Sequence, residues 1–443
     1  MIARNPGCMR SMFVSDSVHL FSNMRHLGRI GLFVATIRKF LVNLKRHERA
    51  LFDAPGQEWT IRYMSKQGQA VFSMVKPSES VRTLEVLGND LFFLVEQFKS
   101  NPHVTRMSSY QLLVRLLREQ CRVEPNAEAG EPKVLIKPNK EVPSDSLQNP
   151  SDPDASYDGH KGKGYQMQVA ETYSRDETKK PLSLITEVIV EPAHHSDAEA
   201  LIPLIEATQQ RGFGPEEVLA DSLYGGDENC QKARERSVEV ISPVIGRPQE
   251  NGLTLADFTG ADEGTVRLCP QGHVPVKVKH KKGKHTAIFS PEVCTVCPRI
   301  NDCPVKAGKK GSYLHYDEKA PRLAKRRAYE KTPAFQEVYR FRAGIEGTMS
   351  QLDRKTRVKH LRVRGLAAVS FCATLKAAGL NLLRAAAFRN SQEDGNLALQ
   401  QRNPGLFGLF SVFKEQFSSL WADFNTFGCY FNPDQLFVTK MTV

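Results

Sequence analysis

The chain has 443 residues, 40% of them apolar and 25% charged, which excludes a disordered chain and leaves room for two or three domains with their own cores. Lys and Arg total 61 against 49 Asp and Glu, and the resulting net charge of +12 favours a polyanionic partner. Residues 1–10 lack the apolar run of a secretory signal, and nine cysteines in a chain of this length do not indicate a disulfide scaffold. We therefore expect a cytoplasmic protein without a membrane span.

The N-terminal third should contain one strand followed by helices. Apolar and polar residues alternate over 12–20, which predicts a first core strand within 11–28 and places Asp16 on one of its faces. Apolar residues then recur at spacings of three and four, which predicts a helical insertion over 29–123. Residues 124–164 are rich in Pro, Asp, Ser and Gly and are expected to form a linker or loop.

The central part should complete a mixed α/β sheet within 165–247. Strands are expected over 165–173 and 182–190, followed by a helix from Asp197 to Arg211 with Ser196 or Asp197 as its N-cap. A short strand over 217–220 should end at Asp221, and a Gly-Gly turn and a helix should separate it from a strand over 238–241. Strands that alternate with helices in this order are typical of an α/β fold.

The remaining chain divides into three expected parts. Residues 248–316 break into short pieces around cysteines, and 317–390 contain two helices, over 333–355 and 365–388. The second helix reaches membrane length but carries Lys376, Asn381 and Arg384, so we interpret it as a buried core helix. Residues 391–443 form a C-terminal tail without an interpretable pattern.

Three acidic residues could carry chemistry: Asp16 in a strand, Asp221 at the end of a strand and Glu346 on a helix. Carboxylates of this kind can hold two divalent cations that activate a water or a 3′-hydroxyl at a phosphodiester. An acid at the carboxyl end of a central strand points into the crevice where open α/β sheets bind ligands.

The segments around these acids are similar to those of insertion-sequence transposases with a DDE active site. Residues 339–348 (YRFRAGIEGT) resemble the Y-(2)-R-(3)-E signature, 218–224 (VLADSLY) resemble the segment with the second acid, and 15–19 (SDSVH) resemble the strand with the first. The resemblance implies an RNase H-like fold in which Asp16, Asp221 and Glu346 hold Mg²⁺ or Mn²⁺. It also implies that Tyr339 and Arg342 contact DNA, and residues 339, 342, 346 and 349 share one helical face.

The chain departs from the family pattern in two places, and a third position has an alternative. Asp353 stands where the signature normally has Lys or Arg, so Arg354 and Lys355 are expected to supply that DNA contact. Asp16 lies close to the start of the sequence, as in a transposase without the usual N-terminal DNA-binding domain. The first acid could instead come from the cluster before the second expected strand, Asp152, Asp154 and Asp158.

Two further features concern metal and DNA. Cys269, Cys294, Cys297 and Cys303 fall within a short stretch, and His273 lies nearby, so these residues could form a zinc-ribbon-like structural Zn²⁺ site or remain reduced thiols. Residues 273–364 contain 23 Lys and Arg against 8 Asp and Glu, which indicates phosphate contacts or a solvated face. Lys161 and Lys163 in a Gly-rich loop are further candidates for DNA contacts.

The leading hypothesis is a DNA transposase of a bacterial insertion sequence that cleaves double-stranded DNA and transfers a 3′-hydroxyl to a target. The resemblance implies a homodimer on paired element ends and location at the nucleoid. No G-x-x-x-x-G-K-[ST] motif occurs, so we expect no nucleotide cofactor. Two alternatives stay open: a catalytically inactive DNA-binding remnant, and an RNase H-like nuclease without joining activity.

Overall fold

The computed structural model describes residues 12–53, 60–124, 132–175, 182–246, 252–260 and 265–397. Most of the expected C-terminal tail (398–443), the Pro248 boundary and part of the expected 124–164 loop therefore lie outside the described residues. Contacts divide the chain into one compact unit, Met1–Ala385, and a second, Ala386–Val443, of which residues 386–397 are described.

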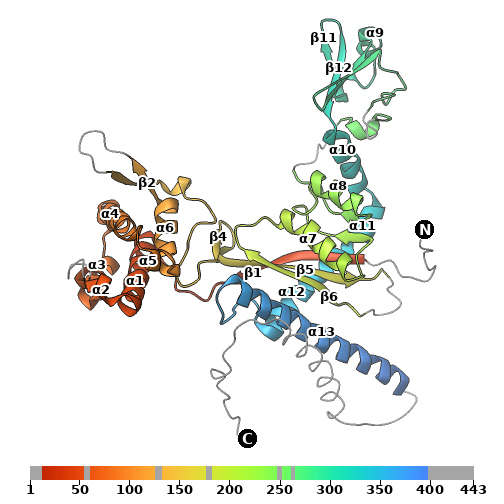
Figure 1. Ribbon diagram of the computed structural model, residues 1–443. Helices are drawn as coiled ribbons and strands as arrows, with labels where there is room; N and C mark the ends of the chain where they lie inside the picture. Colours follow the sequence, from red (N-terminus) through yellow and green to blue (C-terminus); the bar gives the residue numbers. More distant parts are fainter. Residues whose placement is uncertain are drawn as a thin grey trace. The chain divides into compact units, whose positions relative to one another are not determined.

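A six-stranded mixed sheet forms the centre of the first unit (Figure 1). Antiparallel β5 (Gly162–Tyr173) lies between β1 (Met12–Phe21) and β6 (Ile185–Pro192), and short β4 (Ser156–Asp158) pairs with the start of β5. On the other side of β1, parallel β7 (Glu217–Leu219) and β8 (Glu239–Ile241) complete the sheet. The expected mixed α/β sheet is confirmed, and each expected strand lies within two or three residues of its predicted bounds.

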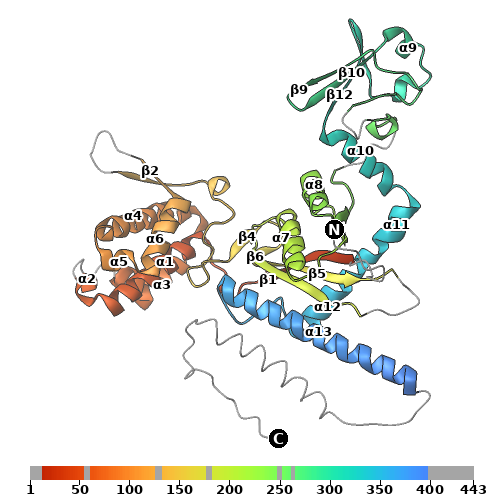
Figure 2. The same ribbon diagram turned by 45° about the vertical axis from the view of Figure 1, so that its right-hand side comes forward.

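Helices cover both faces of this sheet (Figures 1 and 2). One face packs against α7 (Asp197–Gln210), whose N-cap Ser196 accepts a hydrogen bond from the Ala198 N–H, and against α8 (Asp227–Glu235). The other face packs against α12 (Ala343–Thr356) and α13 (Leu366–Leu397). The helix expected over 333–355 is interrupted, because α11 (Pro333–Tyr339) and α12 are joined by a 3₁₀ turn at Arg340–Arg342.

Helix α13 differs from the fully buried helix that the sequence suggested. A 26-residue part of it, Leu366–Ser391, is long and apolar enough to cross a membrane, and only 22% of an 18-residue window within it is buried. Its three polar residues nevertheless bond to the core. Lys376 donates to the Thr356 carbonyl, Asn381 pairs with both backbone groups of Ile185, and Arg384 forms an ion pair with Glu171. A helix tied to a sheet by these polar groups is a core helix with one solvent-facing side.

A separate helical cluster follows β1. It consists of α1 (Arg29–His47), α2 (Arg49–Asp53), a π-helical turn (Thr60–Met64), α3 (Lys66–Ser73), α4 (Ser80–Phe98), α5 (Pro102–Thr105) and α6 (Ser108–Gln120). The hairpin β2 (Cys121–Glu124)–β3 (Lys133–Ile136) packs on it through Val134, and Leu147 adds to the same core. The helical cluster therefore extends beyond residue 123, because apolar side chains of the segment expected to be a loop pack into its core.

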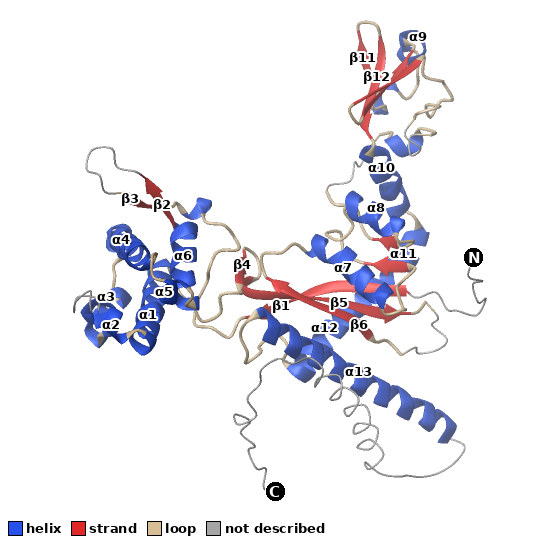
Figure 3. Ribbon diagram, in the orientation of Figure 1, coloured by secondary structure: helices blue, strands red, loops and turns tan. Residues whose placement is uncertain are grey.

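A small four-stranded antiparallel sheet lies between β8 and the α11 helix in the sequence (Figure 3). Its order is β11 (Lys306–Gly308), β12 (Gly311–Asp317), β10 (Lys284–Phe289) and β9 (Lys277–Lys281). The short helix α9 (Pro291–Thr295) carries Cys294, and α10 (Lys319–Glu330) leads away from β12. Ion pairing between Arg322 of α10 and the buried carboxylate of Asp227 joins α10 to α8.

Candidate active site

The fold brings Asp16 and Asp221 to the same level of two neighbouring parallel strands. Val14 of β1 is aligned with Leu219 of β7, and both side chains pack in one apolar cluster with Ile345 of α12. Two residues further along β1, Asp16 lies on the same face of the sheet as Val14. Asp221 follows the end of β7 by two residues, and its carboxylate is among the groups that raise the Asp16 pKa, although 205 positions separate the two acids in the sequence.

Arg342 connects this pair of strands to the third acid. Its guanidinium donates to Asp16 Oδ2 at 2.9 Å and to Glu346 Oε1 at 2.7 Å. Asp16 and Arg342 are largely buried, whereas the Glu346 side chain is 65% exposed. Asp16 and Glu346 also line one open cleft of about 360 Å³ with Met349, Asp353, Arg354 and Lys359 among its other residues.

The electrostatics of the cluster follow from burial and from like charges. Burial raises the pKa of the Asp16 carboxyl above its ordinary value; the Ser17 N–H and Arg342 lower it, and the carboxylates of Asp221 and Asp197 raise it. Burial lowers the pKa of Arg342, but the carboxylate of Asp16 and other negative groups outweigh burial and raise it overall. A carboxylate with a raised pKa beside other acids is a frequent feature of functional sites.

The structure also places the residues expected to contact DNA. Tyr339 ends α11. Burial raises the pKa of its hydroxyl, Arg342 lowers it, and the nearby carboxylates of Asp221 and Asp16 raise it. Arg354 lines the cleft, whereas Lys355 is exposed and is not among the lining residues. Asp353 lies in the cleft and forms an ion pair with Lys359 at 3.7 Å.

Lys161 and Lys163 have different surroundings. The Lys161 ammonium lies 3.4 Å from Ser17 Oγ and 3.5 Å from Asp197 Oδ2, on the face of the sheet opposite to Asp16. Lys163 donates to the backbone carbonyl of Leu27 at 3.0 Å, and burial lowers its pKa. Lys161 is therefore held on the side of Asp197, and Lys163 holds the loop at Leu27.

The side chains of the alternative first acids accept hydrogen bonds that hold the fold together. Asp152 is fully buried and accepts hydrogen bonds from Ser22, from Tyr165 and from the Gly365 N–H. Asp154 accepts from the Leu366 N–H at the start of α13, and Asp158 accepts from two N–H groups of its own turn. The Arg342 contacts join Asp16 to Glu346, whereas the bonds of these three residues go to other parts of the fold.

Sequence reasoning missed two residues next to the acids. Asp197, expected only as a helix start, is buried, accepts from Gln166 and from Gln168, and raises the pKa of Asp16. The sequence placed Lys359 in a basic segment and gave it no role of its own, but in the structure it lines the cleft that contains Asp16 and Glu346. The amide side chains at alternate positions of β5 could have indicated a polar buried partner for Asp197.

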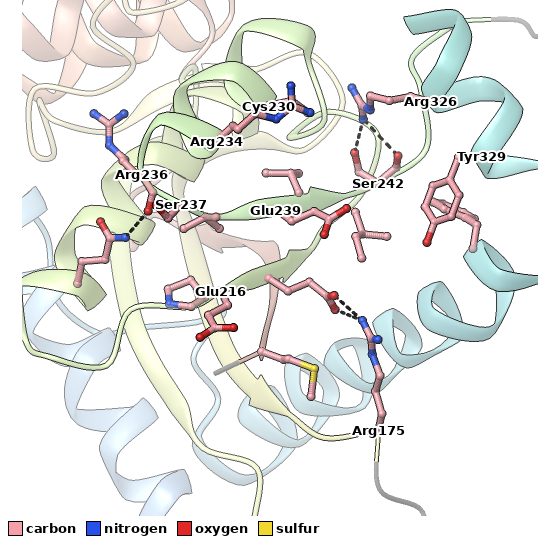
Figure 4. A pocket seen from close by; sticks show the side chains of 18 residues that line it. Arg175, Glu216, Cys230, Arg234, Arg236, Ser237, Glu239, Ser242, Arg326 and Tyr329 are labelled. Atoms are coloured by element: carbon pink, nitrogen blue, oxygen red, sulfur yellow. Dashed lines mark hydrogen bonds and ion pairs between the residues drawn. The ribbon is translucent and has the colours of Figure 1, made fainter. Parts of the chain in front are cut away.

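A second, larger hollow of about 670 Å³ lies along the edge strand β8 (Figure 4). Several arginines line it, and Arg326 reaches across it to Ser242 Oγ at 2.9 Å. Asp16, Asp221 and Glu346 are not among its lining residues. Its size therefore does not make it the site of the acid cluster.

The four cysteines and His273 line one cavity of about 20 Å³ in the small sheet region. All four cysteines are partly buried. Burial raises the pKa of the Cys303 thiol, and the other three cysteines raise it further. Thiolates are soft donors of the kind that suits Zn²⁺.

Comparison with known families gives a match to part of the chain. Residues 268–386 match the family described as "Transposase DDE domain". This segment includes the cysteines and Glu346, and neither Asp16 nor Asp221 lies within it. No curated protein and no solved structure matches the chain. The family match supports a DDE transposase, with Glu346 and the cysteines in the matched part of the chain.

Proposed function

We propose that this protein catalyses divalent-metal-dependent cleavage of double-stranded DNA at the ends of a bacterial insertion sequence, followed by transfer of the 3′-hydroxyl to target DNA. Asp16, Asp221 and Glu346 are the proposed catalytic acids. The observation that carries the proposal is that Arg342 bonds to Asp16 on β1 and to Glu346 on α12, while Asp221 follows β7, the strand that pairs with β1.

The strand arrangement supports an RNase H-like fold. Across the central sheet, short β4 aside, neighbouring strands follow the order β6–β5–β1–β7–β8. The pairs on one side of β1 are antiparallel, and those on the other side are parallel. The helical cluster then stands between β1 and β5 as an insertion, and the Cys-rich sheet stands between β8 and the helix of Glu346.

The donor set fits Mg²⁺ or Mn²⁺. Three carboxylates supply hard oxygen ligands, and the exposure of Glu346 on an open cleft leaves room for waters and phosphate oxygens. When bound, such ions activate an attacking water or 3′-hydroxyl and stabilise the leaving oxygen of a phosphodiester.

The other residues of the cleft would bind and orient the DNA. Arg342 holds Asp16 and Glu346 in place and presents a positive charge where a phosphate would enter. Tyr339 lies beside it, and Arg354 and Lys359 add positive charge along the cleft, so that Lys359 compensates for Asp353. Lys355, Lys161 and Lys163 are proposed as outer contacts to the DNA backbone.

The Cys-rich sheet would carry a structural Zn²⁺ held by Cys269, Cys294, Cys297 and Cys303. The small cavity that the four residues share supports this assignment. Four-coordinate thiolate sites stabilise small sheets whose own apolar core is limited. We further propose that the protein acts at the nucleoid as a homodimer on paired DNA ends.

The proposal is tested by incubating the full chain with supercoiled plasmid DNA and Mg²⁺ or Mn²⁺. Asp221→Ala and Glu346→Ala should abolish nicking and strand transfer, whereas Glu337→Gln, an exposed carboxylate on the preceding helix, should leave both unchanged. Salt-sensitive DNA binding without any metal-dependent cutting would instead indicate an inactive remnant. Cutting without joined products would indicate a nuclease that lacks transfer activity.

A further inference from the structure

Two histidines and a glutamate gather at one end of the small four-stranded sheet. Side-chain ligand atoms of His280, His285 and Glu318 all lie within 4.8 Å of one another. These residues belong neither to the acid cluster around Asp16 nor to the cavity that the cysteines line.

The register of the sheet brings these residues together. His280 of β9 is aligned with His285 of β10, and His285 is aligned with Tyr316 of β12. The two imidazole rings stack with centroids 4.4 Å apart, and Tyr316 stacks on His285 at 5.1 Å. Glu318 follows Tyr316 by two residues, and its Oε1 lies 3.7 Å from His280 Nε2.

His285 is the buried member of this group of three residues, and one of its ring nitrogens lacks a hydrogen-bond partner in the described part of the chain. The residue is only 8% exposed, and its Nε2 has no hydrogen-bond partner among the residues that the structure describes. A buried polar atom without a partner is unfavourable, because it has lost its hydrogen bonds to water. A ligand that accepts the nitrogen lone pair, or donates to it, would remove that penalty.

The surrounding charge distribution permits a cation here despite the many lysines of the hairpin. Lys279, Lys281 and Lys284 occupy positions that alternate with the histidines, so their side chains belong to the opposite face of the sheet. The histidine face continues into the apolar cluster of the small sheet. On that face the carboxylate of Glu318 supplies a negative charge beside His280.

We propose that His280, His285 and Glu318 bind a divalent transition-metal ion of the zinc class. Two imidazoles and one carboxylate match the donors that Zn²⁺ takes, with a water in the fourth position. Tetrahedral bonds of the usual length put donor atoms about 3.4 Å apart, so the site closes by small side-chain rotations. His280 and Glu318 are more than half exposed and can make these rotations. The bound ion fastens the basic β9–β10 hairpin to the start of α10.

The test counts zinc in the full-length protein. The purified chain is stripped with a chelator and dialysed against micromolar Zn²⁺, and bound zinc per chain is measured by mass spectrometry of the metal. His280→Gln, His285→Gln and Glu318→Gln should each hold one zinc ion fewer than the parent chain. His315→Gln is the matched control, because His315 lies on the same sheet and contacts Thr286 instead; it should hold the parent number.

Two readouts separate this site from the cysteines and from misfolding. Cys297→Ser should leave the zinc that depends on Glu318, so the two losses should add in a Cys297→Ser/Glu318→Gln double variant. Because the Glu318 side chain is 59% exposed, Glu318→Gln should keep the parent far-UV circular dichroism spectrum. A parental zinc count in both His280→Gln and Glu318→Gln, or an equal loss in His315→Gln, would overturn the proposal.

Discussion

Arg384 provides the most quantitative prediction, because it links α13, the central sheet and the helix of Glu346. Its guanidinium donates to Glu171 on β5 at 2.8 Å and to Thr348 Oγ1 on α12 at 2.6 Å. The side chains of Arg384 and Glu171 are only 15% and 7% exposed. Arg384→Ala would leave the Glu171 carboxylate buried without its counter-charge.

The expected penalty is about 3–5 kcal/mol, the usual result of removing one partner from a buried ion pair. Hydrogen exchange measured by mass spectrometry should show amides of β5 and α12 exchanging roughly 10²- to 4 × 10³-fold faster, since each 1.4 kcal/mol is about tenfold. Metal-dependent cutting should fall with it, because α12 carries Glu346.

A double variant separates the buried charge from a general disturbance of α13. Glu171→Leu/Arg384→Leu removes both charges and should recover most of the exchange protection, since apolar pairs of similar volume often replace buried ion pairs without loss. Arg362→Ala, at an exposed position, should match the parent chain. The reasoning is refuted if Arg384→Ala exchanges at the parental rate, or if the double variant is no better protected than the single one.

The remaining predictions concern the acids and the cysteines. Because burial raises the pKa of Asp16, Mn²⁺ binding should weaken as the pH falls through that raised value. Arg342→Gln should move the midpoint of this pH dependence to higher pH, because Arg342 lowers the Asp16 pKa. Mn²⁺ titrations at several pH values would show the shift, and an unchanged midpoint would contradict it. A carboxyl whose pKa is raised in the folded state stabilises the fold only when it is protonated, at low pH, and its ionised form destabilises the fold at neutral pH. In the absence of metal, Asp16→Asn should therefore raise the melting temperature at neutral pH, and a lower melting temperature would contradict the account. Asp152→Asn should lower the melting temperature but preserve metal-dependent cutting, because Asp152 serves Tyr165 and the Gly365 N–H; loss of cutting in a folded variant would favour the alternative first acid. Cys303→Ser should release about one zinc per chain, as counted by metal analysis, and retention of that zinc would exclude the cysteine site.

The central sheet could be predicted from the sequence because its strands and helices carry their own signals. Alternation over β1, β5 and β6 and the Ser196 cap of α7 depend on local residues, and the structure has these elements close to the expected positions. Residues 132–147 were harder, because turn-forming residues suggested a loop while Val134 and Leu147 found an apolar core from another segment. Whether such residues pack depends on a surface that local sequence does not reveal.

The same distinction applies to the site. The resemblance to the family motifs selected Asp16, Asp221 and Glu346 as the proposed acids, and the parallel pairing of β1 with β7 brings the strands before the first two together. Asp197 was not predicted as part of the site, because its partners Gln166 and Gln168 lie on strand β5, whereas Asp197 begins helix α7. The position of Lys359 in the cleft likewise depends on the turn after α12, where Arg357 adopts a left-handed backbone conformation.

Helix α13 shows how polar groups decide between two readings of an apolar segment. Its length and hydropathy suit a membrane, and its exposed face is apolar. The bonds of Asn381 to both backbone groups of Ile185 use hydrogen-bonding capacity that a lipid-facing side chain could not satisfy. Its polar residues therefore explain why the helix packs on the sheet.

The most direct test of the central claim is Mn²⁺ binding by the full chain, followed by electron paramagnetic resonance. If Asp16, Asp221 and Glu346 form one site, then Asp16→Asn, Asp221→Asn and Glu346→Gln should each weaken binding by at least about tenfold, as expected when a metal ligand is removed. Glu337→Gln, the exposed carboxylate on α11, should bind Mn²⁺ like the parent chain. Parental Mn²⁺ affinity in any one of the three acid variants would contradict the account.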